Sequence, residues 1–101
     1  MSHILEMPAF TIKAGVSETD VLLAHEKFNC EFMKKQKGYI SHSLVRGGDK
    51  WFDIAVWESI EAKEKAFKDI YENAAALEYI ALIDQIGADE EIPIFTVVKT
   101  Y

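Results

Sequence analysis

The sequence predicts a small α+β domain with the element order strand, helix, strand, strand, helical region, strand. Two kinds of pattern carry this prediction. Segments of strand length are apolar or alternate between apolar and polar residues, and two longer segments repeat their apolar residues at helical spacing. The 101 residues, 50% of them hydrophobic, suit one core and leave no room for a second. We therefore expect residues 1–101 to form a single domain.

The first strand and the first helix are predicted from the N-terminal third of the chain. The segment from Ile4 to Lys13 is mostly apolar, which suits a strand buried on both faces. Pro8 has no N–H to donate to a ladder, so we expect a bulge or a local edge there. Ser17 is a typical N-cap residue, and the helix after it should run to Lys37 and stop at Gly38.

One face of this helix should pack on the sheet. Projected at about 100° per residue, a narrow arc collects three apolar residues and one histidine: Val21, His25, Phe28 and Phe32. Cys30 points the opposite way, which predicts an ordinary surface thiol rather than a nucleophile.

An antiparallel hairpin is predicted in the middle of the chain. Two alternating strands, Tyr39 to Arg46 and Trp51 to Trp57, flank a Gly-Gly-Asp turn. Asp53 shares a face of the second strand with apolar neighbours on both sides. If that face is covered, burial should raise the pKa of the Asp53 carboxyl, although this side chain could equally lie at a solvated edge.

The helical region and the last strand complete the order. Ser59 is the expected cap of the second helix, and the helical pattern continues through a break near Asn73 until Gly87 ends it. The final strand is expected from Ile92 to Tyr101. Two interleaved β-α-β units of this kind form a ferredoxin-like, four-stranded antiparallel sheet with both helices on one face.

The other face of this sheet predicts a homodimer. The first and last strands carry apolar residues on both sides, so a monomer would expose a large apolar surface. Packing two sheets back to back across a two-fold axis would bury that surface.

Two short segments resemble a known group of proteins. The run Lys37-Gly38-Tyr39-Ile40 enters a strand, and Trp57-Glu58-Ser59-Ile60-Glu61-Ala62 leaves one. Both segments are similar to the dimeric α+β barrel proteins, specifically the antibiotic biosynthesis monooxygenase-like group. The resemblance implies a dimeric α+β barrel fold, and it implies work of several kinds: cofactor-independent oxygenation of polycyclic phenols and quinols, haem degradation, or stress-related roles.

The sequence departs from the haem-degrading branch of that group. That branch uses an asparagine on the first strand and a histidine on the second helix, whereas this chain reads Glu6-Met7-Pro8-Ala9 and has no histidine beyond residue 42. Many other members carry a histidine four residues after the Glu-Ala pair, where this chain has Ala66. The missing first-strand asparagine and second-helix histidine argue against haem degradation.

Composition and charge restrict the partners. Acidic residues outnumber basic ones by 17 to 11, which gives a formal charge of −6 and makes nucleic acid an unexpected partner. Neither a secretory leader nor an apolar stretch of membrane-spanning length is apparent, and a single cysteine, Cys30, cannot form an internal disulfide. We therefore expect a cytoplasmic protein that does not bind membranes.

Motif spacing predicts neither a metal site nor a cofactor site. His3, His25 and His42 are scattered, and CxxC, HxxxH and glycine-rich phosphate loops are lacking. His25, placed against the sheet, could act as a base, or it could be a buried histidine satisfied by a neighbour. Asn29, one turn later, could share a ligand with His25 or orient its ring.

Further candidates lie on the hairpin. His42 alternates with Ile40 and Leu44, so it should occupy the same face as those residues and could line a pocket, enter the dimer interface or be purely structural. Trp57 and Tyr39 could stack on a flat aromatic ligand or belong to the core.

Our leading hypothesis is a cofactor-independent monooxygenase that binds a small phenol- or quinol-type aromatic molecule between the first helix and the sheet. His25 would deprotonate the substrate, Asn29 would hold its oxygen, Tyr39 and Trp57 would stack on its rings, and His42 would complete the binding set. The alternative is a non-catalytic dimeric protein that binds a ligand or has a stress-associated role.

Overall fold

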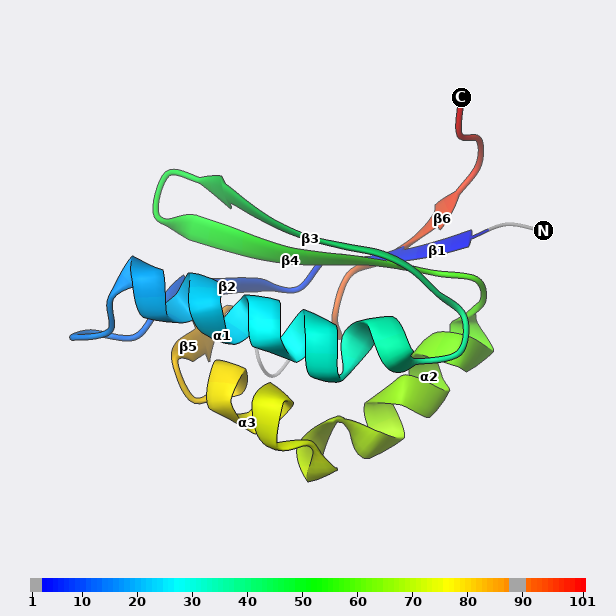
Figure 1. The fold of residues 1–101 in the computed structure, drawn as a ribbon. Helices are drawn as coiled ribbons and strands as arrows, with labels where there is room; N and C mark the ends of the chain where they lie inside the picture. The colour runs from blue at the N-terminus through cyan, green and yellow to red at the C-terminus, as the bar shows by residue number, and fades with distance from the viewer. Residues whose placement is uncertain (1–2, 88–90) are drawn as a thin grey trace.

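All helices lie on one face of a twisted antiparallel sheet (Figure 1). The computed structural model describes residues 3–87 and 91–101. These residues form, in chain order, β1 (His3–Glu6), β2 (Ala9–Ile12), α1 (Glu18–Glu31), η1 (Met33–Lys35), β3 (Tyr39–Gly47), β4 (Lys50–Trp57), α2 (Ile60–Asp69), η2 (Ile70–Glu72), α3 (Ala74–Ile80), β5 (Ile83–Gln85) and β6 (Ile94–Val97). The predicted α+β class and the one-sided placement of the helices are confirmed.

The strands occupy four neighbouring strand positions in one sheet. β3 pairs along the length of β4, while β1 and β2 follow one another along the other side of β4. β6 then pairs with β1, and β5 pairs with β2. The predicted four-stranded antiparallel arrangement is therefore correct for the four strand positions. Two of these positions are each divided into two short strands.

The first predicted strand is divided at Pro8. We expected one strand from Ile4 to Lys13 with a bulge or an edge at this proline, and the structure shows a complete break between β1 and β2. The Pro8 carbonyl still accepts a hydrogen bond from the backbone N–H of Asp53 at 3.0 Å. The contact with β4 thus continues across a residue that cannot donate.

The strand position of β6 also contains a strand, β5, that the sequence pattern did not predict. We expected helix up to Gly87, but α3 ends at Ile80 and β5 pairs with β2, with Ile83 opposite Ile12. An unpaired β2 edge favours this outcome, because its backbone groups need partners that a helix cannot supply. The predicted strand from Ile92 to Tyr101 is also shorter, since β6 covers only Ile94–Val97.

The predicted caps at Ser17 and Ser59 are confirmed, and Asn73, where only a break in the helical pattern was expected, caps α3 in the same way. The side chains of Ser17, Ser59 and Asn73 each accept a hydrogen bond from the backbone N–H three residues later, at 3.1, 3.2 and 3.0 Å. The first helix ends earlier than Lys37, because Phe32 leaves the helical region and both Phe32 and Met33 turn into the core, at 4% and 3% exposure.

The core fills the space between the sheet and the helices. Its largest fully buried side chains are Trp57, Phe10 and Val21. The helix-facing side of β4 carries the set predicted to share one face: Trp51, Asp53, Ala55 and Trp57. Within the described residues, no helix combines the length and apolar character that crossing a bilayer requires.

Gly38 fixes the approach of β3 to α2. Its φ is +87°, and a Cβ added there would lie 2.5 Å from the Cβ of Ala62. Its carbonyl accepts a hydrogen bond from the backbone N–H of Glu58 at 2.7 Å. A larger residue would therefore meet both backbone strain and a close contact at this point.

We expect Gly38→Ala to lower the free energy of unfolding by about 2–4 kcal/mol, from left-handed strain together with overpacking. Gly48→Ala is the matched control, because Gly48 has a φ of +63° but open space around its Cβ position. Urea denaturation of both variants measures the difference. Equal losses for the two variants would show that the contact with Ala62 carries no weight.

Candidate functional site

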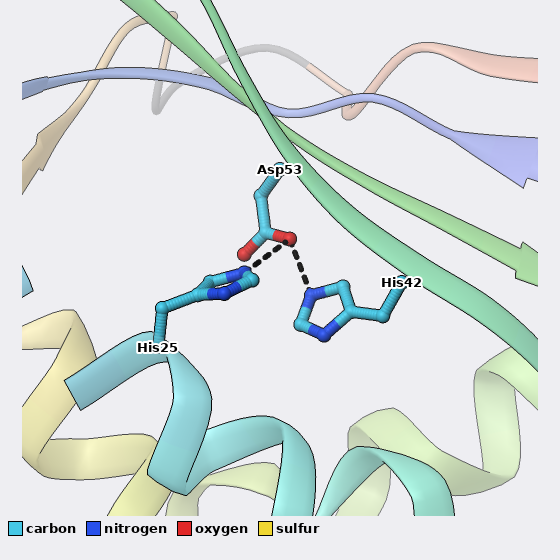
Figure 2. Close-up of side chains that lie close together, drawn as sticks. All are labelled: His25, His42 and Asp53. Atoms are coloured by element: carbon cyan, nitrogen blue, oxygen red, sulfur yellow. Dashed lines mark hydrogen bonds and ion pairs between the residues drawn. The ribbon is translucent and has the colours of Figure 1, made fainter. Parts of the chain in front are cut away.

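Two histidines and one aspartate, each from a different element, meet between the sheet and α1. Asp53 of β4 accepts hydrogen bonds at the same oxygen, Oδ1, from the Nε2 atoms of His25 on α1, at 3.2 Å, and of His42 on β3 (Figure 2). The centroids of the two imidazole rings lie 4.3 Å apart. The three groups therefore form one cluster around a shared carboxylate oxygen.

The cluster depends on a β-bulge in β3. Tyr39 pairs with Trp57, but the next pair is Ser41 with Val56, so Ile40 is an extra residue on its strand. The prediction that His42 shares a face with Ile40 is wrong for this reason. Ile40 is 41% exposed, whereas the side chain of His42 is 1% exposed and points toward α1.

His25 reaches the cluster from the face of α1 that the helical projection predicted. It is 8% exposed and lies between Val21 and Phe28 in the buried stripe of α1. Its ring also meets that of Tyr79 edge-on, with centroids 5.2 Å apart. Cys30 on the opposite side is exposed, as predicted.

Asn29 and Tyr39 hold the ring of His42. The side-chain oxygen of Asn29 accepts a hydrogen bond from His42 Nδ1 at 3.1 Å and another from the Tyr39 hydroxyl at 3.2 Å. Both ring nitrogens of His42 therefore face an oxygen acceptor, Asn29 on one side and Asp53 on the other. This arrangement accommodates a ring that donates at both nitrogens.

Asp53 is held ionised by its neighbours. Burial by itself raises the pKa of Asp53, but the hydrogen bonds from His25 and His42, together with the positive charges of these rings, outweigh it and hold the pKa well below its usual range. The prediction of a raised pKa for Asp53 is therefore wrong. It considered burial alone, whereas two imidazoles favour the charged carboxylate.

A cavity of about 310 Å³ opens beside the cluster. His42 and Asp53 belong to its wall, and most of the remaining wall is apolar. Its aromatic lining residues are Phe10, Phe28, Phe67, Tyr71 and Tyr79. Its volume lies at the lower end of the range for pockets that hold small molecules, and a wall of this kind, with few polar groups, is typical of them.

Glu6 is a second acidic residue in the wall of the cavity, and the sequence analysis missed it as a candidate. It is 3% exposed, and its Oε1 accepts a hydrogen bond from Trp57 Nε1 at 2.8 Å. Burial raises the pKa of Glu6, and the Trp57 bond and the charge of Lys63 offset this only in part. A usable signal was present, because a single glutamate stood in a strand expected to be buried on both faces.

The structure separates the predicted site residues into two groups. His42 lines the cavity, whereas His25, Asn29 and Tyr39 surround the cluster without belonging to the described cavity wall. Trp57 is 0% exposed and supports Glu6 from within the core. The predicted roles of His25 as a base, and of Asn29, Tyr39 and Trp57 as substrate-binding residues, stay predictions.

The same cluster has the composition of a metal site. The ligand atoms of His25, His42 and Asp53 all lie within 4.8 Å of one another. Two imidazoles and one carboxylate are ligands that zinc and iron accept. Local spacing could not indicate this set, because Asp53 lies 28 positions from His25 and 11 from His42.

The fold matches that of several solved structures. SnoaB from Streptomyces nogalater, described as a cofactor-independent oxygenase, is 20% identical with a TM-score of 0.76, over 99% of this chain and 97% of its own. A candidate antibiotic biosynthesis monooxygenase from Chloroflexus aurantiacus is 14% identical with a TM-score of 0.68, over 99% of this chain and 97% of its own. Another, from Bordetella bronchiseptica, is 17% identical with a TM-score of 0.66, over 100% of both chains.

These likenesses establish the fold. No protein-family description matches the sequence, and no curated protein matches it. The chain has the ferredoxin-like α+β fold of the antibiotic biosynthesis monooxygenase-like structures, as the resemblance implied. At these identities the comparison carries shape rather than chemistry.

Asp53 should make stability depend on pH in the acid range. The depressed pKa of Asp53 means that its stabilising effect is complete above the unfolded-state value, about 3.9, and is lost as the pH falls below it. We expect Asp53→Asn to lower the free energy of unfolding by about 2 kcal/mol or more near neutral pH.

The difference in the free energy of unfolding between wild type and Asp53→Asn should become smaller below a pH of about 4. Urea denaturation across pH 3–7, as an approximate range, measures this gap. Asp84→Asn is the control, because Asp84 is exposed on β5. A gap that stays constant to the lowest pH would contradict an Asp53 carboxylate stabilised by the imidazoles.

Proposed function

We propose that this protein is a cofactor-independent oxygenase that acts on a small phenol- or quinol-type aromatic molecule. One observation carries the proposal: an ionised carboxylate shared by two imidazoles stands in the wall of a mostly apolar cavity of about 310 Å³. The shape shared with SnoaB, itself described as a cofactor-independent oxygenase, supports it.

The proposed reaction begins with removal of the phenolic proton. In this step His42 keeps its Nδ1 proton on Asn29 and takes the phenolic proton at Nε2, which the substrate hydroxyl displaces from Asp53, and the phenolate then carries electron density onto a ring carbon. That carbon reduces molecular oxygen and forms one C–O bond, giving a hydroperoxide. Loss of the ring C–H proton and cleavage of the O–O bond then release water and leave a quinone, so the substrate itself supplies the electrons.

The residues divide this work by their positions. His42 and Asp53 contact the cavity, so they are the groups that meet the hydroxyl of the substrate. His25 supports the charge of Asp53 from outside the wall, and Asn29 and Tyr39 fix the ring of His42. The aromatic side chains of the wall provide the apolar surface for the rings of the substrate.

Replacement of the two cluster histidines should separate their roles. We expect His42→Ala to reduce kcat about 10²- to 10⁴-fold, because it removes the imidazole in the wall. His25→Ala should cost about tenfold and move the pH optimum, because it acts through Asp53. Oxygen uptake with a panel of phenols and quinols measures both effects, and His3→Ala serves as the histidine control.

Three outcomes of this experiment decide between assignments. A loss in His25→Ala as large as that in His42→Ala would favour the original prediction that His25 is the base. Uptake that disappears after dialysis against a chelator, and returns with a divalent metal, would instead make the cluster a metal site. Full activity in both variants would reject the cluster as the base.

A non-catalytic ligand-binding protein is the second candidate. The observation that favours it is the pairing of both ring nitrogens of His42, which leaves no lone pair of this ring directed at the cavity. Tight, saturable binding of phenols without oxygen uptake or quinone formation would support this alternative over the oxygenase.

We also propose that the protein is a homodimer joined through the outer face of the sheet. Leu5 pairs with Val56 on one side and with Phe95 on the other, opposite to the face that carries Glu6 and Ala55. Phe95 is 49% exposed, and all helices lie on the other face (Figure 1). An apolar row of this kind on an uncovered sheet is typical of an interface.

The proposed setting is the cytoplasm, where the exposed thiol of Cys30 stays reduced.

The double variant Leu5→Glu/Phe95→Glu should be monomeric, because it places two charges in the centre of the proposed interface. Light scattering coupled to gel filtration gives the mass in solution. Leu22→Glu is the control, since Leu22 is 47% exposed on α1, away from the sheet face. A wild-type protein of monomer mass would contradict the dimer.

A further inference from the structure

Three residues form a row across the floor of the cavity. Ala55 on β4 pairs with Glu6 on β1 and with His42 on β3, and all three belong to the cavity wall. Because neighbouring strands are about 4.8 Å apart, the backbones of Glu6 and His42 are separated by roughly 9–10 Å. The small side chain of Ala55 leaves the space between them open.

Two residues of the cavity wall carry a polar atom that makes no hydrogen bond by distance and angle. Among the described residues, the buried side-chain oxygens without a hydrogen bond are Glu6 Oε2 and the hydroxyl of Tyr79, and both residues line the cavity. Buried polar groups are nearly always paired in folded proteins. The Tyr79 hydroxyl has the Asp53 carboxylate beside it as an acceptor, so Glu6 Oε2 is the group that a polar ligand would complete.

The two groups differ in their position relative to the cluster. Burial, the negative charge of Asp53 and hydrogen bonding to Asp53 raise the pKa of Tyr79, so its hydroxyl keeps its proton and donates toward the cluster. Glu6 lies across Ala55 from His42, and its other oxygen is fixed by Trp57 Nε1 at 2.8 Å. The carboxyl of Glu6 is thus positioned by the core, with one oxygen bonded to Trp57 and the other without a partner.

We propose that Glu6 is the specificity-determining residue of the cavity, and that it selects aromatic ligands with two oxygen substituents on opposite edges of the ring system. One oxygen meets His42, Asp53 and Tyr79, and the other meets Glu6 Oε2. The aromatic nature of the ligand rests on the proposed function, whereas the requirement for a second oxygen rests on Glu6 itself.

Binding without oxygen tests this inference apart from turnover. Calorimetry under anaerobic conditions compares 2,6-dihydroxynaphthalene with 2-naphthol, which differ by one hydroxyl. We expect the wild type to bind the diol about tenfold more tightly or better. The diol should also change the fluorescence of Trp57 more than 2-naphthol does, because Trp57 donates to the same carboxyl.

Variants of Glu6 locate the preference. Glu6→Leu should lower the affinity for the diol to that for 2-naphthol and leave the affinity for 2-naphthol unchanged. Glu6→Gln should keep most of the preference, because an amide can still accept from Trp57 and can bond the second oxygen. Glu72→Leu, at an exposed position on η2, is the matched control.

The outcomes separate this inference from the oxygenase. Equal wild-type affinities for the two ligands, no binding of either, or a preference that survives Glu6→Leu would overturn the role of Glu6. If Glu6→Leu does not fold, the wild-type ratio and the Trp57 fluorescence decide. A Glu6-dependent preference without any oxygen uptake would sustain the inference while rejecting the proposed reaction.

Discussion

The carboxylate of Asp53 imposes a constraint on which the rest of the site depends. A carboxylate between a sheet and a helix is costly to ionise unless donors surround it. Here α1 supplies His25 and β3 supplies His42, so one oxygen ties the helix to the hairpin. The bond from His42 to Asn29 then extends this connection back to α1. The geometry of the cluster and the placement of α1 therefore depend on the same contacts.

Features that rest on local physics could be predicted from the sequence. The caps at Ser17 and Ser59, the hairpin and the buried position of His25 follow from residues within a few positions of each other, and the structure confirms them. Strand β5 and the bulge at Ile40 could not be predicted in this way. Each depends on what a distant edge or strand requires, because pairing partners determine register and strand ends.

The site shows the same division between local and distant information. The sequence left open whether Asp53 lies on a covered face or at a solvated edge, and for a covered face it predicted the wrong direction for the pKa of Asp53. Burial is readable from alternation, but the sign of the shift depends on residues 28 and 11 positions away. Glu6 has no comparable pair of imidazoles, so burial prevails there and its pKa rises.

The cavity therefore holds two carboxyl groups whose surroundings drive them in opposite directions. Asp53 is stabilised as an anion beside His25 and His42, while Glu6, bonded to Trp57, is driven toward its neutral form. Environments that separate two carboxyl groups in this way commonly divide acid and base roles. Because only the methyl group of Ala55 stands between the two ends of the row, a flat ligand can reach both. The two ends of a mostly apolar cavity therefore differ, with a carboxylate anion at one end and a carboxyl group driven toward its neutral form at the other.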